Sequence, residues 1–440
     1  MKRSSFFALL ILFGTGACSV SDDSGFVSPQ AGTGACSVDA QKQFVLDAMR
    51  DVYYWNNLLP VNVDLGAYTT PETLLEYLVS FQPLDEFSYI DLAVSDARFF
   101  GEGQYEGYGF SSRLEATDDL RFTRVFGSGP AAAAGFERGE QILMLNGRTI
   151  TDIEANEGLD ALFSLPSLDF TIRHRDNSEE TIPVNQGLVT IDPLPQWRII
   201  DLPGGTTVGY FELVSFIGTA DAAFEEVFAA FDQANVTDVI VDLRYNGGGL
   251  VSTTELLGNF LGGAVATDSV FSKTIFNANN SFFNRIALFQ SLLESISLSR
   301  LVVIATDRTA SASELITNSM ESHVAVSIVG SATRGKPVGQ LGIPFCEKIL
   351  RPTAFETVNA DDEGGYFDGL PADCPAQDDV LIPIGDDADP NVTTALFLLE
   401  NGACPTPPVA TQGLQKAALG RMDSRRSRGG PAWRRLAGAW

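Results

Sequence analysis

The stretch "LVVIATDRTASASELITNSMESHVAVSIVGSATRGKPVGQ", residues 301–340, decides the fold class and carries the candidate chemistry. It contains two short apolar runs, Leu301–Thr306 and Val324–Gly330, of the kind found in strands that are covered on both faces. Between them, a helix is expected to begin near Ser311 and to continue through Leu315 and Ile316. A strand, a helix and a strand in this order predict an α/β domain whose loops at the strand ends are available for chemistry.

Upstream segments extend this pattern. Thr206–Phe216 and Asp238–Arg244 are predicted strands, and Thr219 is predicted to start a helix with Phe224 and Phe228 on one face. We therefore assign residues 186–410 to a single α/β core.

Two segments precede this core. Residues 38–100 are predicted to be a small helical domain. Apolar positions from Val45 to Trp55 recur at helical spacing, and Thr70 followed by Pro71 predicts the start of a second helix. Residues 101–185 predict a compact β-rich module with short strands, turn-rich loops and a helix near Leu159–Phe163.

The N-terminus has the pattern of an export signal. Lys2 and Arg3 precede an apolar run, Phe6–Phe13, that is too short to span a bilayer, so residues 1–17 are assigned as a signal peptide. The small residues before Cys18 resemble a bacterial lipoprotein cleavage site. We therefore expect a periplasmic protein anchored to the membrane by a lipid on Cys18; the alternative is plain secretion.

The other cysteines fit an oxidising compartment. Without Cys18 they form an even set that can pair in three ways, and the favoured pairing joins Cys346 to Cys374 and Cys36 to Cys404. Their wide spacing has no metal-binding signature. With only two histidines in the chain, we expect neither a metal site nor another cofactor.

Charge limits the class of partner. The formal net charge is −27, even though residues 411–440 form a basic Arg- and Gly-rich tail that is predicted to be disordered. An acidic body argues against nucleic acid as a partner. Residues 18–37, rich in Ser and Gly, are assigned as a flexible tether.

Two motifs at predicted strand ends can serve an acyl-transfer site. In "DLRYNGGG", residues 242–249, consecutive glycines let the backbone turn sharply and point N–H groups into a cleft, as an oxyanion hole requires; such loops also cradle phosphates or simply turn. Ser311 lies at a helix N-terminus, where free N–H groups and the helix dipole favour a developing oxyanion. The plain alternative is that Thr309, Ser311 or Ser313 caps the helix.

Lys336 is the candidate base, because a serine hydroxyl is a poor nucleophile until a base takes its proton. A lysine can do this if burial lowers its pKa from ~10.4 to about 7–8. The histidines are poorly placed: His174 lies in a charged run of the β-rich module, and His323 is expected at the far end of the helix, about 18 Å from Ser311. Ser-Lys chemistry is therefore favoured, and the alternative for Lys336 is a solvated surface charge.

Residues 101–185 resemble a PDZ domain in the segments "PAAAAG" (130–135), "GEQIL" (139–143) and "NG" (146–147). The resemblance implies that the loop Gly107, Tyr108, Gly109, Phe110 holds a peptide's C-terminal carboxylate on backbone N–H groups while the peptide adds as a strand. The alternative is another small β-barrel with tight glycine turns.

Over roughly residues 38–403 the chain resembles the C-terminal processing (tail-specific) serine peptidases. "TASASE", residues 309–314, is similar to the family's "SASASEIF", which implies Ser311 as the nucleophile. The family's lysine and the glutamine hydrogen-bonded to it fall on Lys336 and Gln340. "DLRYNGGG" is similar to "DLRxNPGG", which implies the backbones of Gly248 and Ala312 as oxyanion-hole donors. "GKPVGQ" replaces the family's "GKGTVQ", which leaves substrate preference open.

This resemblance implies a multidomain α+β protein with a helical N-terminal segment, a PDZ-like β-rich module and an α/β core like that of crotonases and ClpP. The implied function is an exported serine endopeptidase that cleaves unfolded or C-terminally recognised polypeptides through a Ser-Lys dyad, with PDZ-mediated capture. The implied partners are polypeptide substrates, the membrane through Cys18, and a second copy of the chain or an adaptor protein. The alternative is a catalytically silent PDZ/core binding or scaffold protein of the periplasm.

Overall fold

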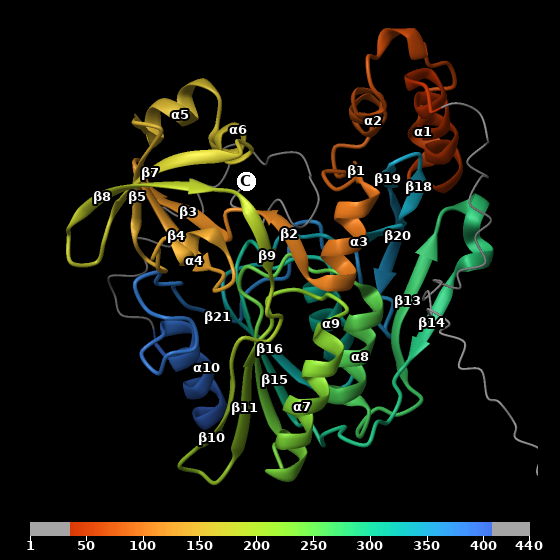
Figure 1. Cartoon of the computed structure of the whole chain (residues 1–440). Coiled ribbons are helices and arrows are strands. Elements are labelled where there is room, and N and C mark those ends of the chain that lie inside the picture. Colours follow the sequence, from red (N-terminus) through yellow and green to blue (C-terminus); the bar gives the residue numbers. More distant parts are fainter. Residues whose placement is uncertain (1–35, 407–440) are drawn as a thin grey trace, which may run out of the picture. The chain divides into compact units, whose positions relative to one another are not determined.

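A computed structural model describes residues 36–406 of the chain (Figure 1). The predicted signal peptide, Cys18, most of the tether and the basic tail lie outside the described residues. Within residues 36–406, no helix has both the length and the apolar character that crossing a bilayer requires.

The N-terminal segment is helical, as predicted. Helix α1 (Val38–Val52) packs against α2 (Pro71–Val79), which begins with Thr70 as its cap and Pro71 in its first turn. The other elements of this segment are η1 (Asn56–Leu58), η2 (Leu65–Ala67), β1 (Tyr89–Leu92) and α3 (Ala93–Glu102). The segment does not stand apart from the core, because β1 pairs antiparallel with β19 (Lys348–Arg351).

The β-rich module occupies residues 104–190 in the structure. Its sheet has the order β3-β4-β5-β7-β8, so that β3 lies at one edge. Buried rings, among them Phe110, Phe122 and Phe170, fill its core. The elements are β2 (Gln104–Gly107), β3 (Phe110–Ala116), β4 (Asp119–Val125), α4 (Pro130–Ala133), β5 (Gln141–Leu145), β6 (Arg148–Thr149), α5 (Ile150–Asn156), α6 (Leu159–Phe163), β7 (Ser167–Arg173), β8 (Glu179–Asn185) and β9 (Gly187–Thr190).

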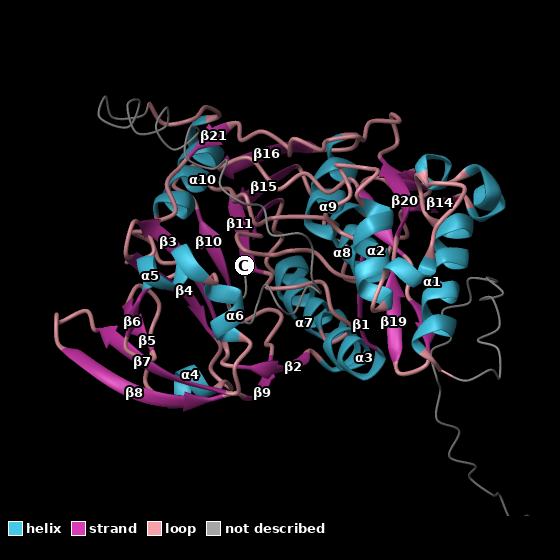
Figure 2. Ribbon diagram, turned by 90° about the horizontal axis from the view of Figure 1, so that it is seen from above, coloured by secondary structure: helices cyan, strands magenta, loops and turns pink. Residues whose placement is uncertain are grey.

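A second sheet, of order β10-β11-β12-β15-β16-β21, forms the centre of the core, and β11, β12, β15 and β16 run parallel. Helices α7, α8 and α9 cover one face of this sheet and α10 covers the other (Figures 1 and 2). Alternate residues point to opposite faces: Val239 and Val241 pack with residues of α7, α8 and α9, whereas Ile240 packs with residues of α10. Covering on both faces explains the continuous apolar runs of the sequence. The elements are β10 (Trp197–Asp201), β11 (Thr207–Glu212), α7 (Ala220–Gln233), β12 (Asp238–Asp242), α8 (Val251–Gly262), β15 (Arg300–Ala305), α9 (Ala312–Glu321), β16 (Ala325–Gly330), β21 (Cys374–Pro375) and α10 (Pro390–Asn401).

Two smaller sheets, of four and three strands, lie outside the β-rich module. The first has the order β14-β13-β20-β17 and contains the segment that ends at Gln340; the second has the order β1-β19-β18. Their remaining elements are β13 (Val270–Phe276), η3 (Ala278–Phe283), β14 (Arg285–Leu288), β17 (Val338–Gln340), β18 (Ile343–Phe345) and β20 (Thr353–Val358). The domain boundaries assigned from the sequence stay predictions.

The predicted disulfide pairing is wrong. The structure joins Cys36 to Cys346, and Cys374 to Cys404. Cys346 lies in the β18–β19 turn, which packs against α1 through the stacked rings of Phe44 and Phe345, so its neighbour is the N-terminal segment. Cys374 lies in β21 at the edge of the main sheet, near the residues that follow α10, so its partner is Cys404.

A buried ionic cluster fixes the loop after β12. Arg244, whose side chain is fully buried, is bonded to Asp242 and Asp389 at 2.7 Å and to Asp378 at 3.3 Å. Asp378 also accepts from Tyr245. Carboxylates and a guanidinium at this depth are tolerable only together, because each would otherwise be an uncompensated buried charge.

We therefore expect Arg244→Met to lower the free energy of unfolding by about 3–5 kcal/mol, since it leaves buried carboxylates without their cation. Urea unfolding followed by tryptophan fluorescence measures this. The control is Arg285→Met, which removes a side chain that is 56% exposed and paired with Glu255; such a pair contributes about 1 kcal/mol or less. Equal losses in the two variants would contradict the role of the cluster.

Candidate active site

The two loops that carry the candidate motifs meet because their strands are neighbours. β12 and β15 are parallel, with Asp242 opposite Ile304, so the chain leaves both strands at the same edge of the sheet. Gly248 follows β12 and Ser311 follows β15. A Cβ atom on Gly248 would lie 2.7 Å from the Ser311 Cβ, and Gly248 has φ +101°, so only glycine fits this approach.

Ser311 is held in an unusual backbone conformation. It has φ +57° and ψ −115° immediately before α9, a conformation that costs a non-glycine residue roughly 1–3 kcal/mol. Its neighbours impose it: the Ser311 carbonyl accepts from the Leu315 amide at 2.8 Å, and the Ser311 amide donates to Glu314 Oε2 at 2.8 Å. The turn places the serine between the end of a buried strand and the beginning of a buried helix.

The Glu314 carboxylate connects the serine to the lysine. Its Oε2 accepts from both the Ser311 and the Lys336 backbone amides, each at 2.8 Å. Its Oε1 accepts from the Gly335 amide at 2.7 Å and from the Thr333 hydroxyl. One side chain therefore fixes the backbone of the candidate nucleophile relative to that of the candidate base.

Glu314 is fully buried, and two opposing effects act on its ionisation. Burial raises the pKa of Glu314 above its ordinary value, while the four hydrogen bonds donated to it lower that pKa. A carboxylate whose oxygens are all approached by donors is best matched in its ionised form, which only accepts hydrogen bonds. The amide of glutamine could not replace it, because one of its two ends donates.

The Lys336 side chain reaches the glutamine that the resemblance implies. Lys336 Nζ donates to Gln340 Oε1 at 2.8 Å, and Gln340 Nε2 donates to the carbonyl of Phe87. The Phe87 ring lies 5.1 Å from Lys336 Nζ, within cation–π range. Lys336 and Gln340 are both half-buried, which excludes the alternative of a fully solvated surface lysine.

Of the two predicted oxyanion donors, Gly248 approaches Ser311 closely and its amide already has an acceptor. The Gly248 amide donates to Asn246 Oδ1 at 2.9 Å. Ala312 is the first residue of α9, so its amide has no carbonyl within the helix to donate to. Asn246 links both parts of the site, because its carbonyl accepts from the Ala310 amide and from the Ser313 hydroxyl, each at 3.0 Å.

The histidines are bonded elsewhere. His174 Nδ1 lies 2.7 Å from Glu140 Oε1 in the β-rich module, and this hydrogen bond raises the pKa of His174. His323 follows the C-terminal end of α9, and its Nε2 lies 2.8 Å from the Val270 carbonyl. Both histidines thus bond to groups outside the loops that carry Ser311 and Lys336.

The loop with the predicted carboxylate-binding role connects β2 to β3. Gly107 ends β2, Phe110 begins β3, and the Tyr108 and Phe110 rings are buried in the module core. Gly109 has φ +82°, and a Cβ atom there would lie 2.7 Å from the Gly129 Cα, so the loop depends on glycine at this position. The loop thus lies at the start of the edge strand β3.

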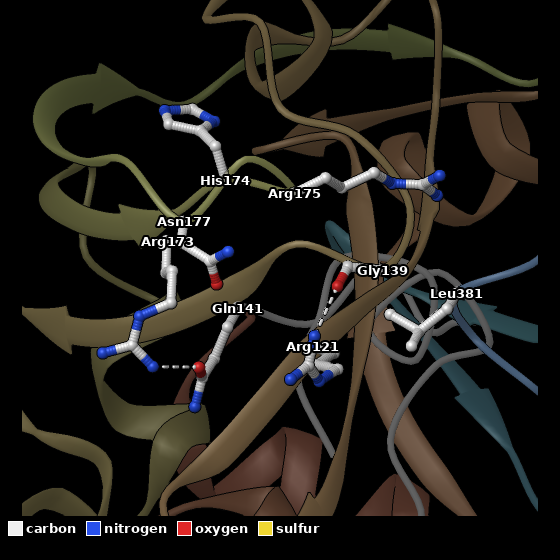
Figure 3. A pocket seen from close by; sticks show the side chains of 8 residues that line it. All are labelled: Arg121, Gly139, Gln141, Arg173, His174, Arg175, Asn177 and Leu381. Atoms are coloured by element: carbon white, nitrogen blue, oxygen red, sulfur yellow. Dashed lines mark hydrogen bonds between the residues drawn. The ribbon is translucent and has the colours of Figure 1, made fainter.

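A separate pocket of about 410 Å³ lies on the β-rich module and not at Ser311 (Figure 3). Its guanidinium groups already have partners: Arg173 bonds to Glu179 and Gln141, Arg121 bonds to Asp119, and Arg175 donates to a backbone carbonyl. We assign it no part in the candidate chemistry. The lining residues are Arg121, Gly139, Gln141, Arg173, His174, Arg175, Asn177 and Leu381.

Sequence reasoning missed three contributors to the site: Glu314, Thr333 and Phe87. A signal for Glu314 was present, because Ser311-x-x-Glu314 has the spacing of a capping box, in which the glutamate returns to the amide of the cap residue. Nothing local marks Thr333 or Phe87, since their roles depend on segments that are distant in the sequence.

Two family models and several curated proteases match parts of this chain. The family model described as "Peptidase family S41" matches residues 207–373, and that of the "Peptidase S41 N-terminal domain" matches residues 40–89. The chain is 24% identical to a carboxyl-terminal-processing protease from Picosynechococcus sp. over 53% of this chain and 55% of that protein. It is 22% identical to the carboxy-terminal processing protease CtpA of Bacillus subtilis over 66% and 60%. The chain spans about half the length of the curated relatives it matches.

Solved structures share the fold. A Bacteroides fragilis protein assigned to the S41 proteases aligns with a TM-score of 0.64 at 22% identity, covering 81% of this chain and 96% of that one. The photosystem II D1 C-terminal processing protease aligns with a TM-score of 0.53 at 20% identity, covering 81% and 100%. The likeness in fold extends well beyond the residues that the family models match.

If Glu314 holds the site together, Glu314→Gln will slow covalent labelling of Ser311 by a fluorophosphonate roughly 100-fold, because a small misplacement of reacting groups has an effect of that order. Mass spectrometry of the labelled protein measures the rate. The control is Glu321→Gln on the exposed end of the same helix, which should label at the original rate. Equal rates in both variants and the unchanged protein would contradict the role given to Glu314.

Proposed function

Because this chain belongs to peptidase family S41, we propose that it is a serine endopeptidase that cleaves polypeptides with Ser311 as the nucleophile and Lys336 as the base. The observation that carries the proposal is the shared hydrogen bonding of the Ser311 and Lys336 amides to one oxygen of Glu314. A strained serine at a helix N-terminus, beside a lysine oriented by Gln340, is the arrangement that acyl transfer needs.

In the acylation step, Lys336 Nζ takes the proton of the Ser311 hydroxyl while Oγ forms a bond to the substrate carbonyl carbon. The carbonyl oxygen becomes an oxyanion, and the amides of Gly248 and Ala312 stabilise it. When the oxyanion collapses, the bond to the leaving nitrogen breaks and the Lys336 ammonium returns the proton to that nitrogen. The products are a free amine and an ester on Ser311.

In the hydrolysis step, a water molecule repeats the sequence. Lys336 takes its proton, the water oxygen bonds to the ester carbon, and Ser311 leaves with the proton. Gln340 accepts a hydrogen bond from Nζ throughout, so the lysine keeps its direction in both protonation states. Since the Gly248 amide donates to Asn246 at rest, the oxyanion must replace Asn246 Oδ1 as its acceptor.

We further propose that the β-rich module is a PDZ domain that captures substrates by the C-terminus. Support comes from the edge position of β3, which leaves a strand available for pairing with an extended peptide. The glycine-dependent loop at Gly109 lies at the beginning of that strand, where the carboxylate of such a peptide would end.

Capture at the module would control the core through Asp378. Arg113 and Arg138 of the module bond to Asp378 at 2.6 and 3.1 Å, and Arg138 also donates to the Tyr245 hydroxyl at 3.1 Å. Tyr245 immediately precedes Asn246, whose side-chain oxygen accepts from the Gly248 amide. A shift of the module on peptide binding would therefore act on the oxyanion loop, which is a gating step of the kind that completes a site only when substrate is present.

We propose the periplasm as the location, with a lipid on Cys18 as the anchor. The two disulfides fit an oxidising compartment and use the four other cysteines of the chain, which leaves Cys18 for a different role.

We expect the protein with Cys18→Ser to fragment an unfolded protein that has an apolar C-terminus, and both Ser311→Ala and Lys336→Ala to lose this cleavage. Removing either member of the dyad removes the activated nucleophile, with a loss of at least roughly 1000-fold. Mass spectrometry of the fragments across pH 6–10 measures it, and activity should rise with pH as the base loses its proton. Cleavage that survives in both variants would remove the dyad from the mechanism.

For capture, we expect a peptide with a free C-terminal carboxylate to stimulate cleavage of a second substrate, and the same peptide with an amidated end to be inert. Gly109→Ala should abolish the stimulation but keep basal cleavage, because its Cβ atom would collide with Gly129 in the loop. Gly127→Ala, where a Cβ atom meets open space, is the matched control and should still be stimulated. Stimulation that persists in Gly109→Ala would count against the loop as the binding site.

A further inference from the structure

We infer that Phe87 is a positioning residue for the base: its ring stabilises the ammonium that Lys336 becomes on taking the Ser311 proton, and its carbonyl holds Gln340. This inference rests on the proposed function and names a residue from the N-terminal segment as part of the same site. Two separate contacts carry it, the ring 5.1 Å from Lys336 Nζ and the carbonyl that accepts from Gln340 Nε2.

The two contacts reinforce one another. Gln340 Oε1 accepts from Lys336 Nζ while Gln340 Nε2 donates to Phe87, so the amide is fixed at both ends and its acceptor end faces the lysine. With Gln340 in this orientation, Nζ is held near the face of the Phe87 ring. An aromatic face carries partial negative charge, so it favours the ammonium over the neutral amine.

The Phe87 backbone is itself fixed by a buried carboxylate. Asp85, which is 6% exposed, accepts from the Phe87 and Ser88 amides at 3.0 Å. It also accepts from the hydroxyls of Ser88 and Thr353, the second at 2.9 Å. The Thr353 carbonyl in turn accepts from the Tyr54 amide at 2.9 Å. Asp85 therefore connects the loop of residues 85–88 to Thr353 of β20, and Thr353 connects it to Tyr54 after α1.

Further contacts hold this loop against the segment that carries the base. Glu86 forms an ion pair with Arg334 at 3.1 Å, two residues before Lys336. β1, which begins at Tyr89, pairs with β19, so the chain that leaves the loop joins the sheet that follows Gln340. Residues 85–89 thus contact Arg334 before the lysine, Lys336 itself and Gln340 after it.

The charged groups near Lys336 define what a substitution at Phe87 would change. Glu314 of α9 accepts from the Lys336 amide, and Asp85 accepts from the Phe87 amide. Glu86 pairs with Arg334, two residues before the lysine, and Glu356 of β20 lies opposite Val338, two residues after it. Phe87→Leu leaves all of them in place. It keeps an apolar side chain at a site that is 4% exposed and removes only the aromatic face.

The direct test is the titration of Lys336 by NMR with lysine labelled with ¹³C at the ε carbon. The chain has six lysines, and the resonance of Lys336 is identified as the one lost in Lys336→Arg. We expect Phe87→Leu to lower the titration midpoint of Lys336 by roughly half a unit to one unit, because the ammonium loses the stabilisation of the ring. Phe87→Tyr, which keeps the ring, should restore the original midpoint.

Cleavage gives the second readout. The acid limb of kcat/KM against pH should move to lower pH in Phe87→Leu by the same amount as the NMR midpoint, and kcat on the plateau should fall. A fall in activity with an unchanged midpoint in both readouts would overturn the inference, since it would reduce Phe87 to a packing residue. If the unchanged protein shows no cleavage at all, the proposed function fails independently of the Lys336 titration.

Discussion

The site depends on one constraint: the Glu314 carboxylate has to satisfy donors from two different segments at once. It accepts from the Ser311 amide at the start of α9 and from the Gly335 and Lys336 amides after β16. The same segments are also joined by the parallel pairing of β15 and β16 and by the hydrogen bond from the Arg334 amide to the Thr309 carbonyl at 2.9 Å. The strained turn at Ser311 and the path of the lysine segment are therefore two consequences of the same buried acceptor.

Around this centre, other segments contribute what the core lacks. The N-terminal segment supplies Phe87, whose carbonyl accepts from Gln340 and whose ring lies near Lys336, and Asp85, which accepts from the Phe87 amide. The β-rich module contacts the core beside the loop after β12, because its Arg113 and Arg138 bond to Asp378 and Arg138 also donates to Tyr245. The loop after β12 thus contacts the module, while Lys336 contacts the N-terminal segment. Under the proposed function, this division would let substrate capture and the positioning of the base be controlled separately.

The sequence predicted those parts of this arrangement that depend on local patterns. Continuous apolar runs identified β12, β15 and β16, helical spacing identified α1 and α7, and Ser311, Lys336 and Gly248 follow those strands where the loops had to meet. Parts that depend on long-range contacts were beyond such patterns. Phe87 lies 253 residues from Gln340, and the Cys36–Cys346 disulfide spans 310 residues, so neither pairing leaves a local signal. The capping-box spacing of Ser311 and Glu314 was a local signal for one hydrogen bond of Glu314, but its other donors come from the turn after the next strand.

The most direct test of the account is to trap the acyl-enzyme. The protein would be mixed with an unfolded polypeptide, quenched in acid after a short time and digested with trypsin, and the peptide Thr309–Arg334 examined by mass spectrometry. If Ser311 is the nucleophile, this peptide will carry an added mass equal to a fragment of the substrate, attached as an ester at Ser311. Cleavage of the substrate with no such adduct, or with the adduct on another residue, would contradict it.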